Sequence, residues 1–378
     1  MLRWCWLLTL AACGFGSPSG NGGADATPAD DAAPSTDDAL TDSRSPLCFG
    51  SFVEVCLAGA PGAAIMVNGG DTLTINTQPG SPDCVATTAD AGACVVAAAS
   101  ISVDGRIRGT GPRPLVLLAT GSIVINMNGV IDVASHRGTA DGDVGAGANS
   151  SRCAAGSTPT ALTGGWGGSN ATKGGNGDHA GGGSTGGNAS NALPRPMAAL
   201  FGGCAGGKGA GGAGGNGGAG GGAIDLIAAV IVINGTVNAS GAGASGATDN
   251  SDGGGGGGSG GMLVLDAPDV TINGSAKVLA QGGSGGEGGP SNISGNGSGG
   301  NGSDPTVPGQ AAAGGIGGGS GGNGGAGATT GNGGDGGDDD GFLGDDGGGG
   351  GGGGAGFIIT TDPTPPTAPL SNVCPALS

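Results

Sequence analysis

Aromatic residues are nearly absent from this 378-residue chain, which has no Tyr, six Phe and three Trp. A conventional layered core, or an aromatic cleft that stacks on sugars, is therefore not expected. Basic residues are also scarce, because 11 Lys and Arg stand against 29 Asp and Glu, for a net charge of −18. Since nucleic acid binding needs clustered basic side chains, nucleic acid is excluded as a predicted partner.

Histidine is almost as rare, with only His136 and His179 in the chain. His136 follows an expected strand close to Asp132, where a structural hydrogen bond is favoured over a general base. His179 lies in a glycine-rich stretch and has no partner visible in the sequence. Asp141 and Asp143 form a weak carboxylate pair of the kind that polysaccharide-processing enzymes use, without a recognisable catalytic signature. We therefore predict no catalytic residue, no enzymatic activity and no cofactor apart from the calcium considered below.

The N-terminal stretch MLRWCWLLTLAAC has a positive charge at Arg3, an apolar run too short to span a bilayer, and small residues before a cysteine. Its last four residues, Leu10 to Cys13, resemble the lipobox of bacterial lipoproteins. That resemblance implies a lipid anchor on Cys13 and so a membrane partner. Because Gly14 and not Asp follows, it favours the outer membrane or cell surface. An ordinary cleaved signal peptide is the alternative.

Seven of the nine cysteines lie beyond the signal peptide and the lipid site. In an exported chain most of them are expected to form disulfides, and the odd count leaves one thiol unpaired. Cys153 and Cys204 bracket a glycine-rich insert and are the first candidate pair. Cys84 and Cys94, which lie close in sequence, are the second.

Four segments repeat one pattern of short alternating strands with Asn-Gly or Asp-Gly between them, at residues 98–111, 115–135, 223–240 and 262–282, and a weaker copy lies at 65–77. Such dipeptides usually form two-residue hairpin turns. However, a unit with three short strands in about 20 residues must stack on its neighbours to bury an apolar face. The side chains predicted to face inward are Ile123, Ile125, Val130, Val133, Val230, Val232, Ile272 and Val278.

The pattern of these repeats resembles the right-handed parallel β-helix of pectate-lyase-like and bacterial surface proteins. The segments GTGPRPLVLLATGSIVIN and DVASHRG, with the long GGxGG stretches, are similar to glycine-rich surface lipoproteins of myxobacteria. The predicted fold is thus mainly β, a right-handed parallel β-helix with glycine-rich inserts, and an antiparallel sandwich or barrel is the alternative. The predicted parts are a signal peptide (1–12), a disordered tether (13–47), N-terminal coils (48–137), an insert (138–222), central coils (223–282) with their own insert (241–260), an acidic insert (283–356), and a final strand and Pro-rich tail (357–378).

Glycine makes up 99 of the 378 residues, and residues 211–222 and 282–290 repeat Gly-Gly-X. A polyproline II helix has three residues per turn, so this repeat places every X on one edge and leaves two edges bare. The pattern resembles the polyproline II bundles of glycine-rich antifreeze proteins and some phage adhesins. Flexible loops stay open as the alternative, because ordering glycine carries a large entropic cost.

Residues 333–338, GGDGGD, fit one unit of the GGxGxD pattern of calcium-binding toxin repeats. Asp335, Asp338, Asp340 and Asp345 are weak calcium candidates, since carboxylates on turns suit hard cations. The unit is not repeated, so a solvated acidic loop is the favoured alternative.

The sequence predicts a lipid-anchored, non-enzymatic surface or envelope protein with a structural, adhesive or matrix role and a polysaccharide or cell-surface partner. One alternative is a carbohydrate-active β-helix enzyme, a polysaccharide lyase or hydrolase, in which His136, Asp132 and Asp141 should converge in one groove. The other is ice or polymer binding through repetitive glycine faces.

Overall fold

The chain divides into two units, Met1–Arg44 and Ser45–Ser378. The computed structural model describes residues 47–85, 87, 92–138, 144–179, 186–194, 199–291, 297–317, 319–338, 346–364 and 372–377, all in the second unit. The predicted signal peptide, the lipid site at Cys13 and nearly all of the tether lie outside the described residues.

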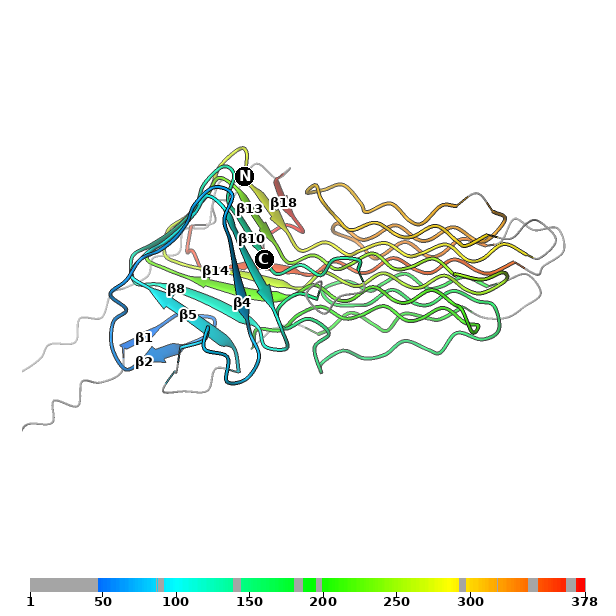
Figure 1. Cartoon of the computed structure of the whole chain (residues 1–378), viewed down its shortest axis with the longest axis horizontal. Helices are drawn as coiled ribbons and strands as arrows, with labels where there is room; N and C mark the ends of the chain where they lie inside the picture. Colours follow the sequence, from blue (N-terminus) through cyan, green and yellow to red (C-terminus); the bar gives the residue numbers. More distant parts are fainter. Residues whose placement is uncertain are drawn as a thin grey trace, which may run out of the picture. The chain divides into compact units, whose positions relative to one another are not determined.

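The described residues are mainly β, contain no α-helix, and form three parallel sheets besides one antiparallel strand pair (Figure 1). Sheet 1 consists of β3 (Ile65–Val67), β6 (Ile101–Val103), β9 (Ser122–Ile125), β12 (Val230–Ile233) and β15 (Val270–Ile272). Sheet 2 consists of β4 (Thr72–Asn76), β7 (Arg106–Thr110), β10 (Val130–Asp132), β13 (Thr236–Asn238), β16 (Lys277–Leu279) and β18 (Val373–Cys374). Sheet 3 consists of β5 (Cys94–Ala98), β8 (Leu115–Ala119), β11 (Ala223–Ile227), β14 (Met262–Asp266) and β17 (Phe357–Thr360).

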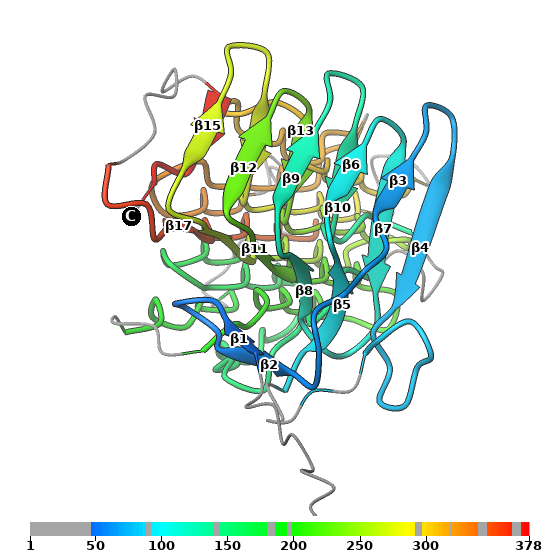
Figure 2. The same cartoon turned by 90° about the vertical axis from the view of Figure 1, so that its left-hand side faces the viewer.

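From β3 onward, consecutive strands enter different sheets, and each pairs with the equivalent strand of the next pass (Figure 2). The chain visits sheet 3, sheet 1 and sheet 2 through β8, β9 and β10, and repeats this order through β11, β12 and β13. The repeated segments predicted from the sequence contain these strands. The Asn-Gly dipeptide after β12 does not form a hairpin, because β12 pairs with β9 and β15 and not with β13.

The core between the sheets is built from branched aliphatic side chains. Of the positions predicted to face inward, Ile123, Ile125, Val133, Ile272 and Val278 are buried in it. The prediction is wrong for Val130, Val230 and Val232, which are half-buried, and Ile131, Ile231 and Ile233 occupy the core instead. Valine and isoleucine stand at both phases of these strands, so alternation alone could not identify the inner face.

The outer face of sheet 3 is also covered, so its central strands β8, β11 and β14 are buried at every residue. An antiparallel hairpin of β1 (Leu47–Phe49) and β2 (Val55–Leu57) packs Val55 and Leu57 against Val116 and Leu118. Phe201 and Phe357 pack edge to face nearby, with ring centroids 6.3 Å apart. Phe357, which the sequence assigned to a strand returning from the last insert, begins β17.

Three long connections separate β10 from β11, β13 from β14, and β16 from β17. We call them the first, second and third inserts. Each runs from sheet 2 to sheet 3, so all three leave the sheets at the same corner. In Figure 1 they extend from the sheets side by side as long, gently waved traces.

The described parts of the inserts are hydrogen-bonded to one another with a period of three residues. The amides of Gly254, Gly257 and Gly260 donate to the carbonyls of Gly348, Gly351 and Gly354 at 2.9, 2.8 and 2.9 Å. The intervening amides of residues 253–261 alternate between two other neighbours, residues 204–210 of the first insert and residues 239–245 of the second. Each segment is therefore tied to several neighbours at once, as a helix with three residues per turn allows.

Glycine is required where these segments approach one another. A Cβ on Gly256 would lie 1.8 Å from the Trp166 carbonyl oxygen, and one on Gly352 would lie 1.9 Å from that of Ala326. The all-glycine runs 253–258 and 347–354 are buried at every residue. In segments at the surface of the bundle the X residue of the repeat points outward, and exposed examples are Ala205, Lys208, Asn216, Asn323 and Ala326.

Disulfides join Cys48 to Cys56, Cys84 to Cys94, and Cys153 to Cys204. The last two are the pairs named from the sequence. Cys374 is the described cysteine that forms no disulfide.

Candidate functional site

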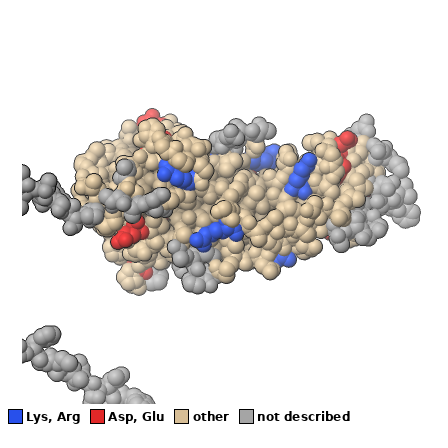
Figure 3. All heavy atoms as spheres, turned by 90° about the horizontal axis from the view of Figure 1, so that it is seen from below, with Lys and Arg blue, Asp and Glu red and all other residues tan. Residues whose placement is uncertain are grey.

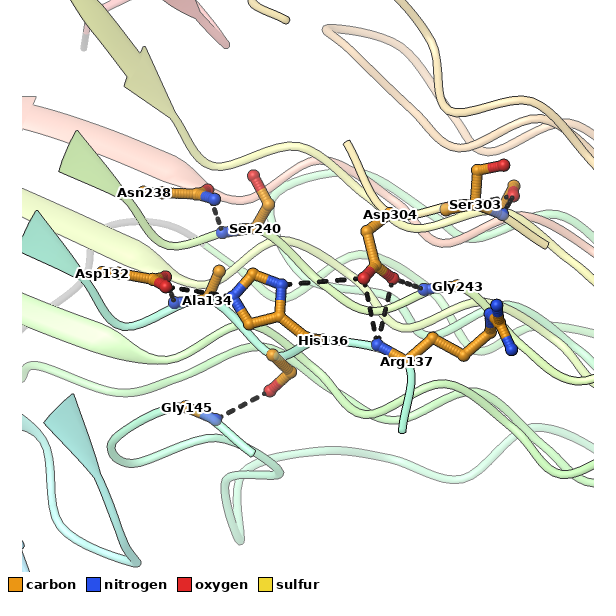
Figure 4. Close-up of polar contacts among 12 residues, drawn as sticks. Asp132, Ala134, His136, Arg137, Gly145, Asn238, Ser240, Gly243, Ser303 and Asp304 are labelled. Atoms are coloured by element: carbon orange, nitrogen blue, oxygen red, sulfur yellow. Dashed lines mark hydrogen bonds and ion pairs between the residues drawn. The ribbon is translucent and has the colours of Figure 1, made fainter. Parts of the chain in front are cut away.

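A cluster of charged side chains lies at the corner where the strands of sheet 2 lead into the inserts (Figure 4). Asp132 is the last residue of β10, and His136 follows four residues later. Asp304 comes from the third insert and reaches the same point. We call Asp132, His136 and Asp304 the corner latch.

Asp132 is buried, with only 2% of its surface exposed, and its carboxylate is surrounded by hydrogen-bond donors and positive charges. Its carboxylate contacts the Arg106 guanidinium, lies 3.2 Å from Arg108 Nη1, and accepts a hydrogen bond from the Ala134 amide at 3.0 Å. Burial would raise the pKa of Asp132, but the hydrogen bond from His136 and the charges of Arg108 and Arg106 outweigh it and hold the pKa below its usual value. Asp132 is therefore ionised at neutral pH.

The two ring nitrogens of His136 face two carboxylates. Nε2 lies 3.0 Å from Asp132 Oδ2, and Nδ1 lies 3.6 Å from Asp304 Oδ2. The interactions with Asp132 and then Asp304 raise the pKa of His136 to about 9, against the opposing effect of burial. The imidazole is thus protonated at neutral pH and both nitrogens act as donors.

Asp304 connects all three inserts. It accepts hydrogen bonds from the Arg137 amide of the first insert, at 3.0 and 3.2 Å, and from the Gly243 amide of the second, at 2.7 Å. Burial is the largest influence on the pKa of Asp304 and would raise it, but the interaction with His136 and the hydrogen bonds from the two amides lower the pKa overall. The latch therefore joins the end of β10 to the first residues of the bundle.

This geometry suits a cross-link better than acid–base catalysis. A protonated imidazole cannot accept a proton at neutral pH, and the oxygens of Asp132 are already occupied by donors. The imidazole also fills the space between the two carboxylates where a glycosidic bond would have to lie. The cluster supplies fixed charges and no free base.

The structure brings Asp132 and His136 together, while Asp141 and Asp143 lie outside the described residues. Sequence reasoning missed Arg108 and Arg106, which stand beside Asp132 and Val130 across the parallel pair β7–β10. The sequence did contain a signal for this contact. When RIR (residues 106–108) is aligned with VID (residues 130–132) of the next repeat, Arg108 falls opposite Asp132. Asp304, 168 positions beyond His136, left no such local signal.

Of the weak calcium candidates, Asp335 and Asp338 are described, and Asp340 and Asp345 lie outside the described residues. Asp335 accepts a hydrogen bond from the Asn176 amide at 2.6 Å. Asp338 instead approaches His179, whose Nδ1 lies 3.2 Å from Asp338 Oδ1 and 2.7 Å from Asp178 Oδ1. These three side chains could offer donor atoms to one metal ion. His179, for which the sequence analysis found no partner, therefore contacts its own neighbour Asp178 and the distant Asp338.

A small pocket of about 160 Å³ lies beside the latch, lined by residues 303–307 and 310–313. On the molecular face in Figure 3, charged side chains are scattered among uncharged residues. Within the described ranges, no helix has the length and apolar character that crossing a bilayer requires.

Comparison with family models, curated proteins and solved structures finds no match to this chain.

Proposed function

We propose that the chain is a lipid-anchored, non-enzymatic protein of the bacterial outer membrane or cell surface, with a structural, adhesive or matrix role. The observation that carries this proposal is the hydrogen bonding between the inserts. Every amide from Gly253 to Gly261 donates to another segment of the bundle. Three inserts that could have been flexible loops are thereby joined into one body, as a mechanical or display role requires.

We further infer that the three sheets form a right-handed parallel β-helix and that the inserts form a bundle of polyproline II helices. The repeated order of strands through sheets 3, 1 and 2 supports the first inference, since parallel pairing of successive passes is how such solenoids bury their apolar faces. The three-residue hydrogen-bond period supports the second.

An adhesive or matrix role gains support from the surface of the bundle. Outward X residues recur at intervals of three, for example at Ala205 and Lys208, and at Asn323 and Ala326. In a polyproline II helix this interval is about 9 Å. A regular display of small and polar side chains suits repeated weak contacts with a polysaccharide or another polymer better than one deep ligand pocket.

The latch supports a non-enzymatic role, because its groups hold the inserts in place. Its imidazole and both carboxylates bind one another, backbone amides or the guanidinium groups of Arg106 and Arg108. The tether before the first strand would place this body at a distance from the membrane.

Cell fractionation tests the anchored location. The wild-type chain, expressed in a bacterium with lipoprotein-processing enzymes, should appear in the outer-membrane fraction, and Cys13→Ser should release it in soluble form. External protease should then cleave the tether of the wild-type protein on whole cells. A wild-type protein that is fully soluble would contradict the anchor, and protection on intact cells would contradict the outward location.

A further inference from the structure

A second pair of carboxylates lies beneath the β1–β2 hairpin. Asp225 is the central residue of β11 and Asp266 is the last residue of β14, the next strand of sheet 3. Across this sheet Asp225 is level with Val116 and Val264. An acidic side chain thus stands in a row of valines on the covered outer face.

Asp225 has no exposed surface, and neither of its carboxylate oxygens has a hydrogen-bond partner at normal distance and angle. Its electrostatic neighbours are the like-charged Asp266 and the backbone amide of Val53. Among the described ion pairs, none joins a Lys, Arg or His to either carboxylate. A buried ionised group normally has a partner of opposite charge, so this pair lacks its counterion.

The surroundings of Asp266 supply donors, one hydroxyl oxygen and space. Asp266 is 4% exposed, and it accepts hydrogen bonds from the Ser51 amide and, each at 2.8 Å, from the Phe52 amide and the Thr361 hydroxyl. A cavity of about 260 Å³ lies beside it, lined also by Gly50, Ser51 and Thr120.

The Val53 carbonyl faces the same region. A Cβ on Gly50 would lie 2.2 Å from that oxygen and 3.3 Å from Asp266 Oδ2. Gly50 has a φ of +89°, a left-handed conformation that glycine adopts without strain. The loop between β1 and β2 therefore brings a backbone oxygen close to Asp266.

We propose that Asp225 and Asp266, together with the Val53 carbonyl, bind a divalent cation of the calcium type beneath the β1–β2 hairpin. Two carboxylates match its charge, and carboxylate, carbonyl and water oxygens are the ligands that Ca²⁺ takes. The ion gives Asp225 the partner that it lacks and cancels the repulsion between the two acids. It also joins the hairpin, the first element after the tether, to sheet 3.

Thermal unfolding of the full-length protein at neutral pH tests this site. Millimolar CaCl₂ should raise the wild-type Tm by about 3 °C relative to EDTA, since a ligand that binds only the folded state stabilises it. Asp225→Asn should lose this shift. Asp225→Val should lose it too, yet have a higher Tm than the wild type in EDTA, because valine completes the apolar row. Asp338→Asn, at the exposed group with His179, is the matched control and should keep the calcium shift.

Two results would overturn the proposal. If CaCl₂ leaves the wild-type Tm unchanged, while lowering the pH in EDTA raises it, the two acids share a proton and hold no metal. If Asp225→Val keeps the full calcium shift, the ion binds elsewhere in the chain.

Discussion

The sheets and the glycine bundle form their interiors in opposite ways. Between the sheets, fully buried side chains such as Ile123, Ile231 and Leu117 make the core. Inside the bundle, residues 253–258 and 347–354 are buried without any side chain beyond hydrogen. An interior can therefore be built from peptide groups alone, provided that each amide finds a carbonyl in a neighbouring segment and no Cβ stands between them.

The two interiors also differ in how far they can stabilise themselves. A peptide hydrogen bond contributes about 1 kcal/mol net, while ordering one residue costs about 1–2 kcal/mol, with glycine at the costly end. The bundle therefore gains little from its own hydrogen bonds, and its attachments to the sheets become important. Strands hold both ends of every insert, and the corner latch and the Cys153–Cys204 disulfide add cross-links.

The largest effect should come from adding one methyl group inside the bundle. Gly256→Ala places a Cβ 1.8 Å from the Trp166 carbonyl oxygen, a contact that neither backbone can relieve without moving. The free energy of unfolding, measured in urea, should fall by about 4 kcal/mol.

Gly212→Ala is the matched control, because it makes the same change in the same bundle where nothing lies within 4 Å of the new Cβ. It should change stability by about 0.5 kcal/mol at most. Equal effects of the two substitutions would mean that the segments are not closely packed.

Removing the disulfide of the first insert should lower the free energy of unfolding about as much as Gly256→Ala does. The double substitution Cys153→Ala and Cys204→Ala opens a loop of 51 residues, which costs about 4 kcal/mol by chain entropy. The equivalent change at Cys48 and Cys56 opens a separation of only 8 residues and should cost about 2.5 kcal/mol. A larger loss of stability from removing Cys48–Cys56 than from removing Cys153–Cys204 would show that the disulfide does not constrain the first insert.

The side-chain core gives a third test, which also checks the inner face of the strands. Ile231→Ala removes a fully buried side chain and should lower the free energy of unfolding by about 3 kcal/mol. Val232→Ala, at the half-buried neighbour on the other face, should lower it by about 1 kcal/mol. If Val232→Ala lowered the free energy of unfolding more than Ile231→Ala does, Val232 would face the core, as the sequence predicted.

The smallest effect concerns the corner latch and depends on pH. Because folding raises the His136 pKa from 6.5 to about 9, its contribution to stability is complete below pH 6.5 and disappears as the pH rises through 9. With solvent screening at this half-buried ring, the contribution is about 1 kcal/mol. His136→Gln should abolish this part of the pH dependence in urea unfolding. An unchanged profile in the variant would show that another group causes it.

The sequence predicts the sheets better than the bundle or the latch, for physical reasons. Strand repeats at 115–135 and 223–240 are local patterns, so the strands were found from the residues themselves. The inner face was misassigned around Val230 because valine and isoleucine occupy both phases. The contacts of Gly256 depend on several segments distant in the chain, and glycine carries no side chain that could identify its partners. The latch needed Asp304, whose approach to His136 follows only from how the inserts pack.

The central claim is that the glycine inserts form an ordered, hydrogen-bonded body. Hydrogen–deuterium exchange, followed by mass spectrometry of peptides that cover residues 253–261 and 347–356, tests it most directly. We expect these amides to exchange slowly, with protection approaching that of β8 and β11, because each donates to a neighbouring segment. Exchange at the rate of an unstructured peptide, with the sheet strands still protected, would contradict the claim.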